Sequence, residues 1–147
     1  LGLAYFLMAD YPKAVEALKT CMTYADNPDL KVATTYWLYL AELRSGNESV
    51  VDVLLSEIHP DMEIIENDAY LQQLLIFKSG STSFAGDAIG SDTVPRALSQ
   101  YGISCWLDAS GRKAEAAMIR KEMLSTAGWP MFGFIVAEAD SARLFVQ

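Results

Sequence analysis

The chain has 147 residues, a length that favours a single domain with a sizeable hydrophobic core. Its formal net charge is −8 and it has no cluster of lysine and arginine, which argues against binding to nucleic acid or to an anionic membrane. Apolar residues make up 52% of the chain, but the longest apolar runs end before the roughly 18 residues that a membrane span requires. We therefore expect a soluble chain whose apolar residues line buried helix faces or a surface for a partner.

The first residues do not have the pattern of a signal peptide, because no basic stretch precedes the apolar residues 1–9. The sequence begins without methionine, and Leu1 already lies in a helical pattern. We expect the chain to be a fragment of a longer protein. A targeting signal would then precede Leu1, so the cellular compartment stays open.

Four short turn signals divide the chain at a regular spacing. If Ala9, Gly46, Gly80 and Gly111 are equivalent turn residues, the intervals between them are 37, 34 and 31 residues. Their mean of 34 residues is typical of a repeat built from helical hairpins.

Helical segments without internal proline precede these turns, at residues 1–8, 31–44, 65–78 and 97–109. Amphipathic helices follow the first, second and fourth turns, because apolar residues recur there at helical spacing. Asp29 and Asp68 are predicted to cap the second and third of the preceding segments.

Two further segments modify this regular pattern. Residues 81–92 are rich in glycine and serine, so we predict a loop in place of the second helix of the third unit. Gly128 is expected to end the fourth unit, and Trp129 and Pro130 to start a last helix over 131–144. That helix would close the end of a stack of repeats.

The opening residues resemble the tetratricopeptide-repeat family. The family motif reads Leu-Gly-x-Ala-Tyr, three further residues, Gly-Asp-Tyr, two further residues and then Ala. The chain matches it at residues 1–5, Asp10, Tyr11 and Ala14, and departs from it at Ala9. The small side chains at Gly2, Ala4 and Ala14 are expected to let the two helices of the hairpin approach closely.

The later units match the motif less well, and Arg120 stands where the family usually has an aromatic residue. Residues 111–135 resemble the C-terminal part of poorly characterised bacterial tetratricopeptide proteins, which implies no particular chemistry. The resemblance implies an all-α, right-handed solenoid of antiparallel helix hairpins with about four units. We place the units at residues 1–28, 29–64, 65–93 and 94–128, with a degenerate third unit and a capping helix at 129–147.

No motif for catalysis or for metal or cofactor binding emerges. His59 is the only histidine, and no CxxC or phosphate-binding glycine motif occurs. The acidic residues between Asp61 and Asp68 could form a cation or acid–base site, but a solvated loop before a helix is the preferred interpretation. Cys21 and Cys105 are expected to be buried thiols rather than a disulfide. We therefore predict no enzymatic activity and no cofactor.

A set of side chains recurs at fixed distances before the turns. Tyrosine lies ten residues before each of Gly46, Gly80 and Gly111, and further residues of the same helix face lie six and three residues before them. The resemblance places this face in a groove that binds a partner. The predicted groove residues are Tyr36, Leu40, Leu43, Tyr70, Leu74, Phe77, Tyr101, Cys105 and Asp108. The alternative is that the tyrosines pack as core, as aromatic stripes at helical spacing more often do.

The main functional hypothesis is a non-enzymatic scaffold that binds a protein or peptide on the concave face of the solenoid. This hypothesis comes from the family resemblance. The alternatives are a helical accessory region of a larger enzyme and a small-molecule pocket beside the irregular third unit. Nucleic acid and membrane are not expected as partners, and self-association through an exposed first hairpin stays open.

Overall fold

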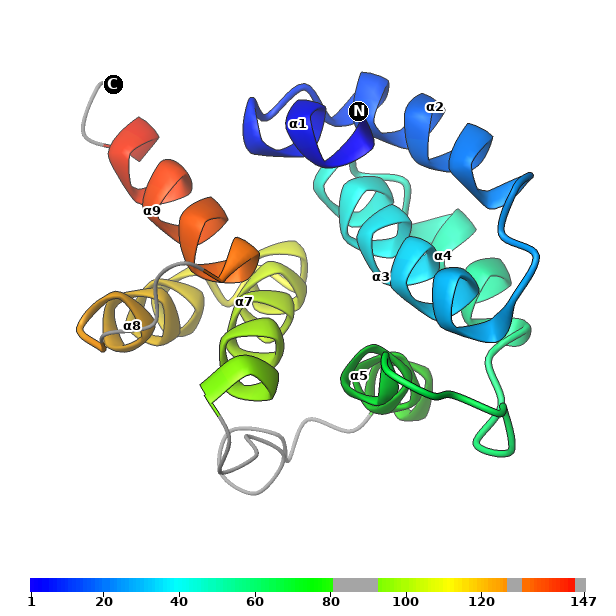
Figure 1. Cartoon of the computed structure of the whole chain (residues 1–147). Coiled ribbons are helices and arrows are strands. Elements are labelled where there is room, and N and C mark those ends of the chain that lie inside the picture. Colours follow the sequence, from blue (N-terminus) through cyan, green and yellow to red (C-terminus); the bar gives the residue numbers. More distant parts are fainter. Residues whose placement is uncertain (81–92, 127–130, 145–147) are drawn as a thin grey trace. The chain divides into compact units, whose positions relative to one another are not determined.

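A computed structural model describes residues 1–80, 93–126 and 131–144, and these residues form eight α-helices and no β-strand (Figure 1). The predicted all-α class is therefore confirmed. The chain divides into two compact units, residues 1–81 and 82–147, which are described in turn. None of the described helices combines the length and the apolar character that crossing a membrane would require.

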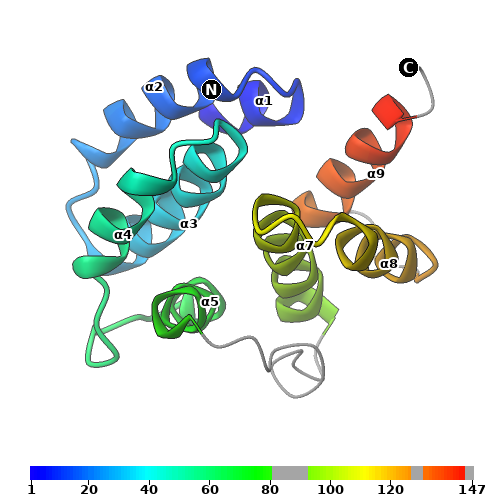
Figure 2. The same ribbon diagram turned by 180° about the vertical axis from the view of Figure 1, so that it is seen from behind.

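Unit 1 contains the helices α1 (Gly2–Leu7), α2 (Tyr11–Met22), α3 (Pro28–Arg44), α4 (Glu48–Ser56) and α5 (Asp68–Ser79). Each of them packs against the next one along the chain, and α3 also packs against α5 (Figures 1 and 2). The first two helices form one antiparallel hairpin, and α3 and α4 form another. Helix α3 contacts α2, α4 and α5, so it is the central element of the unit.

The four turn residues that the spacing predicts to be equivalent share one backbone conformation. The φ angle is 59° at Ala9, 77° at Gly46, 62° at Gly80 and 77° at Gly111. Within the described residues, these four are the only ones with a positive φ. Ala9 is the one that is not glycine, and its Cβ makes the left-handed conformation costly. The spacing in the sequence therefore locates the ends of the helices that precede these turns.

The start of α3 differs from the prediction. The side chain of Asn27 accepts a hydrogen bond from the backbone N–H of Leu30 at 2.8 Å, and a proline follows Asn27 in the first helical turn. The predicted caps are wrong, because Asp29 lies inside the first turn of α3 and Asp68 is the first residue of α5. The sequence pattern favoured Asp29 because it directly precedes Leu30, whereas Asn27 lies three residues before Leu30.

Aromatic rings join α1, α3 and α5 in the core of unit 1. Trp37 packs edge-on against Phe6, with 5.4 Å between ring centroids. Tyr36 packs edge-on against Tyr70 at 5.2 Å and stacks on Phe77 at 6.4 Å. Such aromatic pairs contribute about 0.5–1.5 kcal/mol each beyond the area they bury.

The first hairpin closes at small residues. A Cβ atom on Gly2 would lie 2.6 Å from Cγ of Leu18, so a larger residue here would displace the Leu18 side chain. This contact confirms the close approach predicted at Gly2, and Ala14 is also buried. Ala4 is exposed and makes no such contribution.

Unit 2 contains α7 (Thr93–Ala109), α8 (Lys113–Leu124) and α9 (Phe132–Leu144). Helices α7 and α8 form a hairpin, and α9 packs against both. The apolar cluster between α7 and α8 contains Ile103, Leu107 and Ala116, with Trp106 and Ile119 against it. Helix α9 crosses α7 so closely that a Cβ on Gly133 would lie 3.0 Å from the carbonyl oxygen of Ala97.

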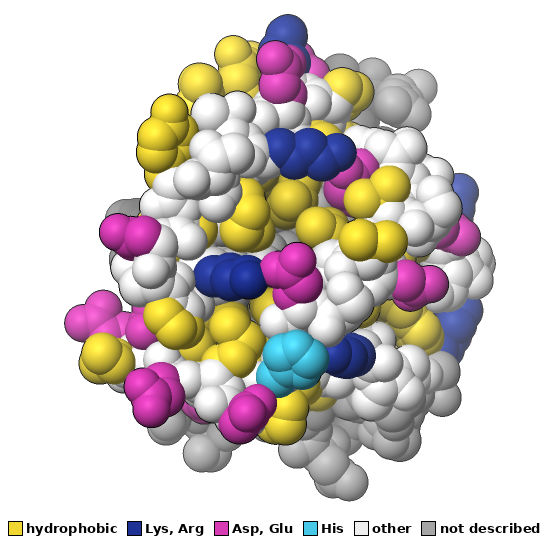
Figure 3. Space-filling model, turned by 90° about the vertical axis from the view of Figure 1, so that its right-hand side faces the viewer, with side chains coloured by type: hydrophobic (Ala, Val, Ile, Leu, Met, Phe, Trp, Pro, Cys, Tyr) yellow, Lys and Arg dark blue, Asp and Glu magenta, His cyan; other side chains and the backbone are white. Residues whose placement is uncertain are grey.

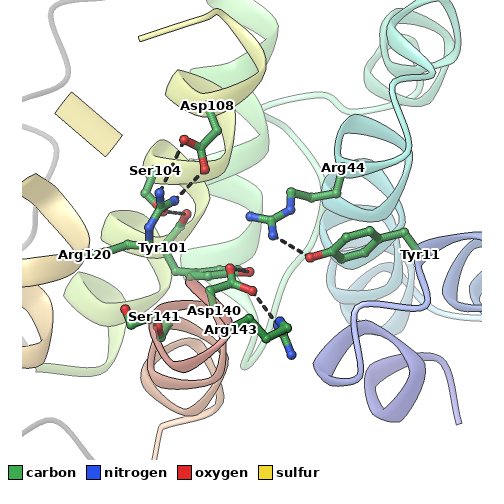
Figure 4. Close-up of polar contacts among 10 residues, drawn as sticks. Tyr11, Arg44, Tyr101, Ser104, Asp108, Arg120, Asp140, Ser141 and Arg143 are labelled. Carbon is green, nitrogen blue, oxygen red and sulfur yellow. Dashed lines mark hydrogen bonds and ion pairs between the residues drawn. The ribbon is translucent and has the colours of Figure 1, made fainter. Parts of the chain in front are cut away.

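Polar side chains also connect the three helices of unit 2 (Figure 4). Arg120 on α8 forms an ion pair with Asp108 on α7, with 2.7 Å between Nη1 and Oδ2. Tyr101 on α7 donates a hydrogen bond from its hydroxyl to Asp140 on α9 at 3.0 Å. Arg143, one turn after Asp140, contacts the same carboxylate at 2.6 Å. Each of the three helices therefore contributes a charged side chain to these contacts.

The observed helices can be compared with the predicted units. Helices α1 and α2 fall in the predicted unit 1–28. Helices α3 and α4 fall in the unit 29–64, except that α3 begins at Pro28. Helices α7 and α8 fall in the unit 94–128, except that α7 begins at Thr93. The loop predicted at 81–92 and the helix boundary predicted at Gly128 to Pro130 lie outside the described residues. The structure describes the two units separately, so the continuous right-handed solenoid stays a prediction.

Candidate binding surface

The tyrosines of the predicted groove lie mostly in the core. Tyr36 and Tyr101 are each 0% exposed, whereas Tyr70 is partly exposed. Among the other six predicted residues only Asp108 is partly exposed, and the buried ones are Leu40, Leu43, Leu74, Phe77 and Cys105. This burial favours the alternative interpretation, in which these residues pack as core.

The contacts of these side chains explain their burial. Tyr36 meets Trp37 on its own helix at 5.1 Å and Tyr70 on α5 at 5.2 Å, so its face of α3 is the one that packs against the neighbouring helix. In unit 2, the Tyr101 hydroxyl bonds to Asp140 and the Asp108 carboxylate pairs with Arg120. The polar groups of Tyr101 and Asp108 are therefore engaged within the chain.

Unit 1 has a groove elsewhere, with a volume of about 730 Å³, between α1, α2 and α3. Its walls include Ala17 and Cys21 from α2, Tyr24 from the connection after α2, and Leu30, Ala33 and Trp37 from α3. Residues of α1 line one end, and Tyr70 of α5 lies beside Trp37, whose indole N–H is 3.4 Å from the tyrosine hydroxyl. The volume falls within the range of about 300–1,000 Å³ that is usual for ligand sites.

The different lengths of α1 and α2 account for this groove. Helix α1 has six residues and is about 9 Å long, whereas α2 has 12 residues and is about 18 Å long. The first residue of α1, Gly2, contacts Leu18, so the shorter helix does not reach the last turn of α2. Most of the side chains that line this space are small or apolar, and Lys13 and Glu16 are the charged ones among them.

Large apolar side chains are exposed around the groove. Four of the eight exposed large hydrophobic residues in the described parts of the chain line it. They are Leu1 (84% exposed), Leu3 (36%), Tyr24 (75%) and Leu30 (38%). An exposed apolar patch bordered by polar residues commonly marks a site of interaction with another molecule.

One end of the groove carries charged side chains of both signs. Lys13 forms an ion pair with Asp10 at 2.6 Å, which lowers the pKa of the Asp10 carboxyl and raises the pKa of the lysine. The Lys13 ammonium also lies 5.7 Å from the ring centroid of Tyr5. Glu16 lines the groove and forms no ion pair within the described residues.

The other end of the groove is acidic. Asp29, next to Leu30, accepts hydrogen bonds from the backbone N–H groups of Ile65, Glu66 and Asn67, which holds this acidic segment against the first turn of α3. These hydrogen bonds, with those from Glu66 and Ile65 contributing most, lower the pKa of the Asp29 carboxyl. Hydrophobic side chains lie among both acidic and basic ones on the face of unit 1 drawn in Figure 3.

The acidic residues around His59 lie in the segment before α5 and are exposed. Within the described residues, no group of histidine, cysteine and carboxylate side chains is arranged to hold a metal ion. Cys21 and Cys105 form no disulfide; Cys105 is buried as predicted, but Cys21 is partly exposed and lines the groove. The Cys21 Sγ lies 3.7 Å from the hydroxyl of Thr34 on α3.

Comparisons with protein-family models, with curated proteins and with solved structures find no match to this chain. The resemblance to the tetratricopeptide family therefore rests on the residues of the sequence.

Of the nine predicted groove residues only Tyr70 lines this groove, because the binding face was predicted by offset from the turns. One signal could have located it. Ala17 and Cys21 are small residues one helical turn apart on α2, and Ala33 is a small residue on α3. Small residues on two adjacent helices leave room for a third.

Proposed function

We propose that this chain is a non-enzymatic module that binds a protein or peptide segment, and that the groove between α1, α2 and α3 is its binding site. The observation that carries the proposal is the gathering of exposed apolar side chains around this one groove. Apolar surface of this kind loses contact with water when a partner covers it, which favours association by about 25 cal/mol per Å². We assign to this groove the partner-binding role that the sequence predicted for the tyrosines.

We further propose that the hairpins are tetratricopeptide-like. The support is the motif at residues 1–14, the tight contact at Gly2 and the shared left-handed conformation of Ala9, Gly46, Gly80 and Gly111. In such hairpins, small residues set the distance between the helices and a left-handed residue ends the first helix.

A peptide library displayed to the whole chain tests the function. The variant Ala33→Arg places a long side chain in the groove, and Ala117→Arg makes the same change at an exposed position of α8 in unit 2. We expect selected peptides to bind the native chain and Ala117→Arg equally and to lose binding to Ala33→Arg. Peptides that bind all three proteins equally would place the site elsewhere, and a library without binders would contradict the function.

A further inference from the structure

We propose that the occupant of the groove is one basic, amphipathic α-helix of a partner protein, laid along α2 and α3 beyond the end of α1. This inference rests on the proposed function and adds the conformation and the charge of the partner. Three properties of the groove carry it: the nature of its walls, the size of the side chains on them and the charge around it.

The walls of the groove favour a helix over an extended peptide. Both walls are α-helices, whose backbone N–H and C=O groups are bonded within the helix and offer nothing to a partner backbone. An extended peptide in this groove would leave its own backbone groups facing apolar side chains, which is costly. A helix satisfies its backbone internally and presents only side chains.

The side chains on the walls suit the close approach of a helix. Ala17 and Cys21 on α2 and Ala33 on α3 leave shallow grooves between larger neighbours, into which the ridges of another helix can pack. Packed helices lie about 8–10 Å apart, and small residues at the contact permit the lower end of this range. Leu30, which is 38% exposed, then supplies the larger apolar surface along the α3 wall.

The charge around the groove favours a basic partner. Residues 1–81 contain twelve acidic and five basic residues, a formal charge of −7. The basic residues near the groove are already paired, Lys13 with Asp10 and Lys31 with Glu57. Glu16 on the lining and Glu66 beside the first turn of α3 are exposed and carry the unbalanced charge.

The same charge disfavours a second copy of this chain as the occupant. Two copies would each bring a net charge of −8, so their association would meet electrostatic repulsion at low ionic strength. A partner helix with lysine or arginine along its solvent-facing sides instead gains attraction from the acidic surroundings.

Cys21 provides a direct probe of occupancy, because it lines the groove and is partly exposed whereas Cys105 is buried. The ligand is a synthetic helix of about 14 residues with alanine and leucine along one face and lysine on the others. Matched controls carry glutamate in place of every lysine, or the same composition with the apolar stripe scrambled. The readout is the rate at which iodoacetamide alkylates Cys21 in the whole chain, measured by mass spectrometry.

We expect the lysine helix, at about ten times its dissociation constant, to slow alkylation of Cys21 about tenfold. The glutamate and scrambled peptides should leave the rate unchanged, and added salt should weaken the protection by the lysine helix. Glu16→Lys should reduce protection without disturbing the fold, because Glu16 is exposed. Ala33→Arg should abolish the protection of Cys21, and circular dichroism checks that this variant keeps its helical content.

Four results would overturn the inference. Equal protection by the glutamate helix would contradict the charge assignment. A library peptide that loses binding to Ala33→Arg but binds in an extended conformation would contradict the helical partner. The proposed function would then remain intact. Protection of Cys21 that appears on raising the concentration of the chain alone would make a second copy the occupant. If no peptide of any kind binds, the proposed function fails together with this inference.

Discussion

Arg120 and Asp108 form a two-pronged ion pair across the hairpin of α7 and α8, with Nη1 2.7 Å from Oδ2 and Nη2 3.3 Å from Oδ1. The arginine side chain is 8% exposed and the carboxylate 24%. The same guanidinium lies 3.3 Å from the hydroxyl of Ser104. Arg120 stands at a position where the tetratricopeptide family, which the sequence resembles, usually has an aromatic residue. Its partner Asp108 is one of the residues that the sequence predicted for a binding groove.

Removing the guanidinium should destabilise unit 2. Arg120→Ala leaves the Asp108 carboxylate partly buried without its counter-charge, and we expect the free energy of unfolding to fall by about 2–3 kcal/mol. Urea denaturation followed by circular dichroism measures the change. Arg112→Ala is the matched control, because Arg112 pairs with Glu115 on the surface and its loss should have little effect. Equal effects of the two substitutions would contradict the structural role of Arg120.

The left-handed turn at Ala9 should be improved by glycine. Ala9→Gly removes the Cβ that is strained at a φ of 59°, and we expect a gain of about 0.5–1 kcal/mol after the greater freedom of glycine in the unfolded chain is counted. The reverse change, Gly46→Ala, should cost about 1 kcal/mol. No atom lies within 4 Å of a Cβ built on Gly46, so only the backbone conformation is tested there. Thermal unfolding of both variants provides the comparison, and shifts of the same sign would contradict the shared conformation.

The crossing of α9 over α7 should not tolerate a methyl group. Gly133→Ala would ordinarily stabilise a helix, but here the new Cβ would lie 3.0 Å from the backbone oxygen of Ala97, which cannot rotate away. We expect a net loss of about 1–2 kcal/mol as the two helices move apart. Glu138→Ala on the exposed side of α9 serves as the control and should be close to neutral. A stabilised Gly133→Ala variant would show that the two helices do not cross this closely.

The carboxylate of Asp29 should contribute to stability only above acidic pH. Its pKa is lowered from 3.8 in the folded chain by backbone hydrogen bonds, first from Glu66 and then from Ile65. A lowered folded pKa means that the contribution is fully present above the ordinary pKa and is lost as the pH falls below it. The difference in unfolding free energy between the native chain and Asp29→Asn should therefore be constant from about pH 7 to pH 5 and shrink below about pH 4. A difference that does not change with pH would contradict the role of the charge.

The turns were predictable from the sequence because their signals are local. A glycine or a small polar residue that ends a helix is visible in a stretch of a few residues, and Gly46, Gly80 and Gly111 were located in this way. The apolar periodicity of α2, α4 and α8 is local for the same reason. The cap at Asn27 was missed because Asp29, two residues later, also has the side chain of an N-cap.

The binding surface could not be predicted because it depends on which helices lie side by side. The spacing of Tyr36, Tyr70 and Tyr101 predicts equivalent positions on three helices, but periodicity does not say whether such a position meets a neighbouring helix or the solvent. The groove exists because α1 covers only part of α2, which is a property of packing. The pairing of Arg120 with Asp108 likewise needs the hairpin to bring together residues that are 12 positions apart.

The pattern of helix contacts has a consequence for the rate at which the chain folds. In both units, each main helix contact joins elements that are adjacent or separated by one helix, such as α3 with α5 or α7 with α9. Short loops close quickly, and domains with such a low contact order reach the native state in microseconds to milliseconds. The helices of unit 1 lie within residues 1–79, so their contacts with one another can form as soon as that stretch has left the ribosome. It is then expected to form its structure while residues 82–147 are still being synthesised.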